Sequence, residues 1–179
     1  QQLRLSFFLA LSASEQEAFR RSLVNQEENK SVTLLAYCLM PNHFHLIIRQ
    51  NEEIGISTFI ANVTNSYTKY FNTKHKRPGY LFQGPFKAVR VETDEQLLHL
   101  SRYIHINPVV SGIIQAEMLS SYQWSSLPEY ENRHISSLCD TAWLTQFFPS
   151  TEKYHQFLFD QVGYARKLEA IKHLALEEA

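Results

Sequence analysis

The feature that most constrains this chain is a pair of histidines separated by one apolar residue, His43-Phe44-His45, followed by the aliphatic run Leu46-Ile47-Ile48. If this stretch is a β-strand, its side chains alternate between two faces, so His43 and His45 point to the same side and Phe44 points into a core. Two neutral imidazoles on one strand face can share a divalent metal ion through their ring nitrogens. Two ordinary histidines that happen to alternate remain the alternative at this point.

The composition fits one compact domain with a short appendage, since 44% of the 179 residues are hydrophobic. No apolar run approaches the ~20 residues that a membrane helix needs, and no signal peptide is recognisable. Cys38 and Cys139 have no metal-binding spacing, which favours a reducing, cytoplasmic location. The chain opens on Gln1 rather than Met, which suggests that residues upstream are missing from this numbering.

A basic segment rich in aromatic residues lies in the middle of the chain, between Ile54 and Val91, where no acidic residue occurs. We expect its cations to bind DNA: Lys69, Lys74, Lys76, Arg77, Lys87 and Arg90. Cations bind phosphates and exposed rings stack on bases, so this pattern is typical of a groove for single-stranded nucleic acid. A solvated basic loop beside ordinary core aromatics explains the same pattern equally well.

Local patterns predict strands over 3–11, 31–40, 43–49 and 86–92, with a short helix over 14–23 and a longer one from Ser57 to about Thr73. This β-α-β-β-α-β order predicts an α+β fold, an antiparallel sheet with helices on one face. We expect this domain to span 1–130. A helical extension without a catalytic motif is predicted over 131–179.

A third helix is predicted from Thr93, which opens a capping-box pattern, to Asn107, where Pro108 is expected to end it. His99, Tyr103 and Asn107 follow one another at intervals of four residues. Residues four apart lie on the same face of a helix, so these three side chains form a polar stripe beside the apolar face.

These features are consistent with one chemistry on DNA. Mg²⁺ or Mn²⁺ bound between His43 and His45 can polarise a phosphodiester oxygen. A tyrosine hydroxyl can attack the phosphorus and form a covalent phosphotyrosine, which keeps the energy of the broken bond for strand transfer without a nucleotide cofactor. The amide oxygen of Asn107, one turn after Tyr103, can complete the coordination of the metal.

Two linked motifs resemble those of the IS200-like, single-tyrosine HUH transposases, and more narrowly the REP-associated tyrosine transposases. The motifs are Tyr37-Cys38-Leu39-Met40-Pro41-Asn42-His43-Phe44-His45 and Arg102-Tyr103-Ile104-His105-Ile106-Asn107-Pro108. The stretches 66–72, 79–87 and 122–126 are similar as well, so the resemblance covers roughly 32–128.

The resemblance implies a ferredoxin-like HUH nuclease domain that binds hairpin-bearing single-stranded DNA. It implies metal-dependent endonuclease and strand-transfer activity through a 5′-phosphotyrosine, as in DNA transposition and recombination. His43 and His45 would be metal ligands, Tyr103 the nucleophile and Asn107 the third ligand, at a position where the wider family often has glutamine.

Alternatives remain open for the nucleophile and for the function. Tyr67 also lies on a helix after the histidines, but its helical neighbours Val63 and Phe71 are apolar, which favours packing or stacking. His99 is either a structural histidine or a group that touches DNA or takes up a proton. The competing functions are a domesticated hairpin-binding regulator that does not cut and a zinc hydrolase, which would lack the usual further ligands and general base. Monomer and homodimer are equally compatible with the sequence.

Overall fold

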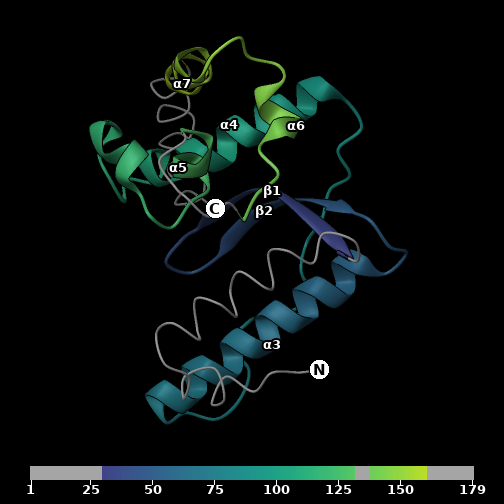
Figure 1. Cartoon of the computed structure of the whole chain (residues 1–179). Helices are drawn as coiled ribbons and strands as arrows, with labels where there is room; N and C mark the ends of the chain where they lie inside the picture. Colours follow the sequence, from purple (N-terminus) through teal and green to yellow (C-terminus); the bar gives the residue numbers. More distant parts are fainter. Residues whose placement is uncertain (1–29, 132–137, 161–179) are drawn as a thin grey trace, which may run out of the picture.

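An antiparallel hairpin lies at the centre of the fold in the computed structural model, which describes residues 30–131 and 138–160 (Figure 1). Strand β1 (Val32–Leu39) pairs with β2 (Phe44–Gln50), and the register sets Cys38 opposite His45. Both strands are rich in β-branched, aromatic and aliphatic residues, which favour the pleated conformation. The two central strands predicted from the sequence, 31–40 and 43–49, are therefore confirmed.

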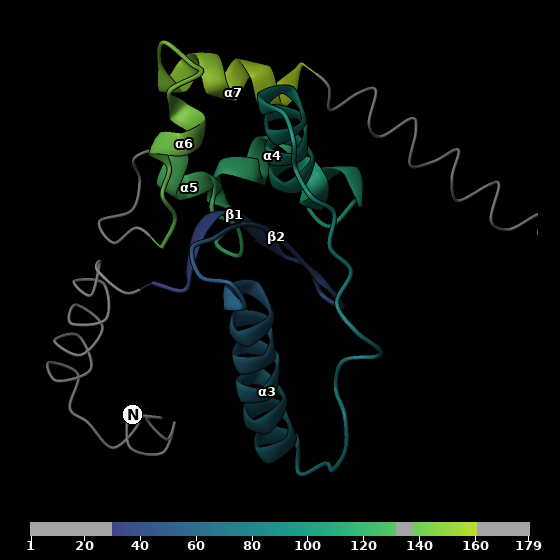
Figure 2. The same cartoon turned by 90° about the vertical axis from the view of Figure 1, so that its right-hand side faces the viewer.

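Helices cover both faces of this hairpin, so the predicted packing of helices on one face is wrong. Helix α3 (Gly55–His75) lies on one side, and α4 (Asp94–Val110) with the later helices lies on the other (Figures 1 and 2). The physical reason is the composition of β2. Leu46 and Ile48 point to one face and Ile47 to the other, so each face carries apolar surface that needs a cover.

Helix α3 begins directly against the start of β1. Gly55 is buried there, and a Cβ atom at this position would collide with the carbonyl oxygen of Ser31. Only glycine permits this close approach of two backbones. From there α3 runs away from the hairpin, and its C-terminal end, closed by Lys76 in the left-handed conformation, is the part of α3 that lies farthest from the strands (Figure 2).

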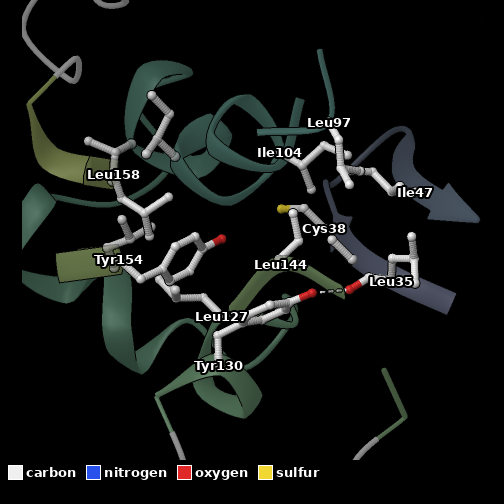
Figure 3. Packing of buried hydrophobic residues seen from close by; sticks show 14 of the residues in the cluster. Leu35, Cys38, Ile47, Leu97, Ile104, Leu127, Tyr130, Leu144, Tyr154 and Leu158 are labelled. Atoms are coloured by element: carbon white, nitrogen blue, oxygen red, sulfur yellow. Dashed lines mark hydrogen bonds between the residues drawn. The ribbon is translucent and has the colours of Figure 1, made fainter. Parts of the chain in front are cut away.

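The main core forms between the hairpin, α4 and the helices that follow it. In the described residues these are η2 (Ala116–Ser121), α5 (Leu127–Tyr130), α6 (Ala142–Thr145) and α7 (Thr151–Phe159). Figure 3 shows Cys38 of β1, Ile104 of α4 and Tyr154 of α7 in this one cluster of buried side chains. The boundary predicted near residue 130 remains a prediction, but described residues on both sides of it share this core. None of the described helices is long and apolar enough to cross a membrane.

The outer edge of β1 is covered by the chain that follows α4. The Leu39 amide donates to the carbonyl of Trp124 at 2.8 Å, and the Ser126 amide donates to the carbonyl of Tyr37 at 3.0 Å. Near the other end of the strand, the Asp140 amide donates to the Leu34 carbonyl at 2.9 Å. These bonds satisfy backbone groups that an open sheet edge would leave unpaired.

The strand predicted over 86–92 is wrong, because this segment is extended but pairs with no strand in the described residues. Its alternation is real, yet Val89 is 88% exposed, since neither of the described strands lies beside it. The strand over 3–11 and the helix over 14–23 lie outside the described residues. The described chain is thus an α+β arrangement with a two-stranded antiparallel sheet, and the ferredoxin-like fold stays a prediction.

Pro108 does not end α4, contrary to the prediction. The helix continues through it to Val110, and Pro108 and Val109 are both buried. Proline removes one backbone hydrogen bond from a helix and strains the preceding turn. Here the burial of Val109 in the core outweighs that penalty, and the Pro108 carbonyl accepts bonds from the amides of Ile113 and Ile114 at 2.9 and 3.2 Å.

Candidate nucleophile and metal-binding site

His43 and His45 point to the same side of the hairpin, as strand alternation requires. Their Nε2 atoms lie 3.0 Å apart and their rings meet edge to face, with centroids 4.7 Å apart. His43 precedes the first residue of β2 and is exposed, whereas His45 is half-buried against α4. The paired arrangement that the spacing predicts is therefore present in the structure.

Asn42 orients the first of the two imidazoles, a role that the sequence analysis missed. Its side-chain oxygen lies 2.6 Å from Nδ1 of His43. An amide oxygen only accepts hydrogen bonds, so this contact holds the proton of a neutral His43 on Nδ1 and leaves the lone pair on Nε2, facing His45. Partners that fix a tautomer in this way are typical of histidine metal ligands. The available signal was a polar residue directly before the histidine pair.

His45 is held in its neutral form by its surroundings. Burial lowers the pKa of its imidazole, and the nearby His43 lowers it further, because a second positive charge so close would repel the first. Only the neutral imidazole offers a lone pair to a metal ion.

Tyr103 reaches this pair from α4. Its ring meets the ring of His45 edge to face, with centroids 5.4 Å apart, and 47% of the residue is exposed. Tyr67, the competing candidate, lies on α3 across the hairpin, where its ring contacts Tyr70, Phe71 and Phe82. The structure therefore brings Tyr103, and not Tyr67, to the histidine pair.

Asn107 lies one turn after Tyr103 and is only 5% exposed. Its amide nitrogen lies 3.3 Å from Nε2 of His45, and its amide oxygen accepts a hydrogen bond from the Ser111 hydroxyl at 3.0 Å. Coordination through oxygen, as the sequence analysis expects, thus requires the amide to turn over about its Cβ–Cγ bond. Asn107 thus lies close enough to bind a metal ion at the histidine pair, but its amide nitrogen and not its oxygen faces His45.

The side chains present fit a divalent metal ion of a particular kind. For octahedral coordination with bonds of about 2.1 Å, adjacent ligand atoms are about 3.0 Å apart. The two Nε2 atoms have this spacing, 3.0 Å. The described residues contain no group of three or more His, Cys, Asp or Glu side chains that could hold a metal ion, so a site at the histidine pair needs the amide oxygen of Asn107 as a further ligand. Two imidazole nitrogens with one amide oxygen suit Mn²⁺ better than Mg²⁺, which prefers oxygen ligands.

His99, the remaining member of the polar stripe, turns toward the start of α4. Its Nε2 lies 3.8 Å from a carboxylate oxygen of Glu95, one turn earlier on the same helix, and both side chains are exposed. His99 therefore contacts Glu95, on the N-terminal side, and not Tyr103 or Asn107, which follow it on α4.

The six cations expected to bind DNA divide into two groups, and all are exposed. Lys69, Lys74, Lys76 and Arg77 gather at the C-terminal end of α3, whereas Lys87 and Arg90 lie on the extended segment that leads to α4.

Two of the cations are held by aromatic rings at the end of α3. The Lys74 ammonium lies 5.6 Å from the ring centroid of Tyr70 and donates to its hydroxyl at 3.3 Å. The Arg77 guanidinium lies 5.8 Å from the ring centroid of Phe71. Such cation–π contacts keep the charges on the surface in a defined position.

A series of aromatic rings connects this basic end of α3 with β2. The ring of Phe44, between the two histidines, lies 5.8 Å from that of Phe82. Phe82 in turn lies 6.2 Å from Tyr67, and Tyr67 lies 6.3 Å from Tyr70. Tyr67 and Tyr70 are 49% and 41% exposed, so the series presents aromatic surface to solvent.

Comparison with known proteins identifies the family of the chain. A family model described as "Transposase IS200 like" matches residues 10–107, which is more than half of the chain. No curated protein and no solved structure matches the chain. The matched range contains the histidine pair, the basic aromatic segment and α4 up to Asn107. The chain belongs to the IS200-like transposase family.

Proposed function

We propose that this chain is a single-tyrosine HUH nuclease and strand transferase of the REP-associated branch, which cuts hairpin-bearing single-stranded DNA through a 5′-phosphotyrosine. Membership of the transposase family makes it, in general, a DNA-cleaving enzyme. The observation that carries the finer proposal is the approach of Tyr103 to His45, 5.4 Å between ring centroids, where His45 is itself paired with His43.

In this proposal His43, His45 and Asn107 hold a divalent ion, with Mn²⁺ favoured by the nitrogen ligands. The ion, when bound, withdraws charge from a non-bridging phosphate oxygen. Asn42 keeps the lone pair of His43 directed into the site. The desolvation that lowers the pKa of His45 keeps its ring neutral and able to bind.

Tyr103 acts as the nucleophile. Its hydroxyl oxygen forms a bond to phosphorus while the bond from phosphorus to the 3′ oxygen breaks, and the 3′ oxygen leaves as a hydroxyl after taking up a proton. The tyrosine proton passes to solvent, which reaches this half-exposed side chain. The phosphotyrosine then preserves the energy of the broken phosphodiester, so a second 3′ hydroxyl can reverse the step on another strand.

The DNA strand would follow the aromatic and basic surface of α3. Lys69, Lys74, Lys76 and Arg77 would bind phosphates. The exposed rings of Tyr67 and Tyr70 would stack on unpaired bases, in line with the use of rings by proteins that bind single strands. In this arrangement Tyr67 contributes to binding and not to cleavage.

The test is a covalent-adduct experiment. Protein is incubated with Mn²⁺ and single strands that are labelled at the 3′ end, which stays with the protein, and that carry hairpins from the DNA flanking the gene. The products are separated on a denaturing protein gel. We expect a labelled adduct that needs Mn²⁺, persists in Tyr67→Phe and disappears in Tyr103→Phe. An adduct lost only in Tyr67→Phe would transfer the nucleophile to α3. Tight hairpin binding without any adduct would support a regulatory protein that does not cut.

A further inference from the structure

A second histidine of α4, His105, lies between Tyr103 and Asn107 in the sequence and is completely buried. Its Nδ1 lies 2.6 Å from the hydroxyl of Tyr154 on α7, and its Nε2 lies 2.7 Å from the hydroxyl of Ser126. Neither partner of the buried ring is a carboxylate that could pair with an imidazolium, so the ring is treated as neutral with one proton. Each ring nitrogen thus takes part in one hydrogen bond within the core.

The hydrogen bonds continue from His105 to the hairpin. The Tyr37 amide donates to the Ser126 hydroxyl oxygen at 2.9 Å, and that hydroxyl donates to the Tyr37 carbonyl at 3.2 Å. If His105 Nε2 donates to Ser126 and Nδ1 accepts from Tyr154, every donor in this network has an acceptor. Tyr37 of β1 pairs with Leu46 of β2, the residue directly after His45.

This network joins the two elements that form the candidate site. Tyr103 and Asn107 come from α4, and the histidine pair comes from β2 and the residue before it. The apolar contacts between α4 and the hairpin are not directional, so they permit small shifts along the helix axis. Hydrogen bonds restrict both distance and angle. A displacement of about 1 Å at a reacting group costs on the order of a hundredfold in rate.

We propose that His105 is a positioning residue, which sets the register of α4 on the hairpin through Ser126 and ties it to α7 through Tyr154. The helical segment after residue 138 would then serve the site by holding the nucleophile helix in place. The effect on the reaction rests on the proposed function, but the effect on the geometry does not.

The experiment compares three variants by a measurement that needs neither metal nor DNA. His105→Leu removes both hydrogen bonds of the ring. Tyr154→Phe removes one hydroxyl and leaves the packed ring. Leu158→Ala, a matched control, removes a fully buried side chain one turn further along α7 that makes none of these hydrogen bonds. The ring-proton NMR signals of His45, assigned with His45→Gln, report the distance to the Tyr103 ring through its ring current.

We expect the His45 signals to shift in His105→Leu and Tyr154→Phe and to stay unchanged in Leu158→Ala, although Leu158→Ala lowers the melting temperature. With hairpin DNA and Mn²⁺, we expect the rate of adduct formation to fall on the order of a hundredfold in His105→Leu. The rate of adduct formation should fall less in Tyr154→Phe and stay unchanged in Leu158→Ala below the melting temperature of that variant. The affinity for DNA should be the same in all three variants.

His45 signals that stay at their wild-type positions in Tyr154→Phe and in folded His105→Leu would overturn the positioning role. If His105→Leu does not fold, Tyr154→Phe decides. Signals that shift equally in the Leu158→Ala control would also overturn it, because general loosening of the core would then explain the effect. If the wild-type protein forms no adduct, the proposed function fails, and the NMR comparison still decides the role of His105.

Discussion

The ring of Tyr103 lies edge-on to the ring of His45, at an interplanar angle of 78° and a centroid distance of 5.4 Å. The two residues come from a helix and a strand that are separated in the chain by all of α3 and by the extended segment after it. Their approach therefore depends on how α4 docks on the hairpin. This docking also places Tyr103, and not Tyr67, beside the histidine pair.

The basic end of α3 predicts how the affinity for DNA depends on salt. Lys74→Ala and Arg77→Ala should each weaken the binding of single-stranded DNA. Each should also reduce the slope of log affinity against log salt by about 0.7, the value for one phosphate contact on a single strand. Fluorescence anisotropy at several salt concentrations measures both quantities. Lys153→Ala on α7 is the control, because this exposed lysine interacts with Gln156 of its own helix. An equal loss in the control would contradict a defined DNA path along α3.

The contact between Asn42 and His43 predicts the metal affinity of the pair. Asn42→Ala removes the acceptor that holds the proton of His43 on Nδ1, so the ring is free to rotate and to carry its proton on Nε2. We expect the affinity for Mn²⁺ to fall about 10- to 100-fold, as for other partners of metal-binding histidines. Calorimetric titration with Mn²⁺ checks this, with Asn65→Ala on the exposed surface of α3 as the control. Unchanged affinity in Asn42→Ala would mean that Asn42 does not orient the site.

The two buried thiols give a prediction about pH. Burial raises the pKa of Cys38 to about 12 and also raises the pKa of Cys139. Because the thiolate is the reactive form, a thiol reagent should modify the native protein very slowly, with little acceleration between pH 7 and 9. The unfolded protein should react quickly, as thiols with a pKa near 8.5 do. Absorbance with a chromogenic disulfide reagent, with and without denaturant, measures both rates.

The raised pKa of the buried thiols also predicts how the stability of the fold changes with pH. The unfolded thiols ionise near pH 8.5 and the folded ones do not, so the unfolded state loses protons first as the pH rises. The contribution of these thiols to the free energy of unfolding is therefore complete below about pH 8.5 and declines as the pH rises toward 12. Rapid labelling of Cys38 in the native protein at pH 7 would show that β1 is less protected than its buried position indicates.

Local patterns in the sequence predicted those parts of the fold that depend on neighbouring residues. The strands β1 and β2, the start of α4 at Thr93 and the helix α7 all follow from side-chain alternation, helical spacing or capping. The Thr93 side chain accepts a hydrogen bond from the Gln96 amide at 3.2 Å, as a capping box predicts. These features are decided within a few residues, where backbone preference and side-chain spacing suffice.

Three predictions that depended on distant contacts were wrong. The segment 86–92 alternates like a strand, but no strand in the described chain pairs with it. Pro108 looks like a helix terminator, but the burial of Val109 carries α4 past it. The distribution of helices over both faces of the hairpin is likewise a property of the packed molecule, since the apolar residues on both faces of β2 require a cover but do not determine which helix covers which face.

The sequence alone determined that His43 and His45 share one strand face and that Tyr103 and Asn107 share one helix face, because both periodicities are properties of the backbone. Only the tertiary structure decided that the second face meets the first, that Tyr67 lies across the hairpin, and that the Asn107 amide turns its nitrogen toward His45. The sequence determines which side chains share a face because the direction of a side chain follows from local backbone dihedral angles. The docking of α4 on β2 depends instead on a buried core and on the hydrogen bonds of His105, whose partners are far away in the chain.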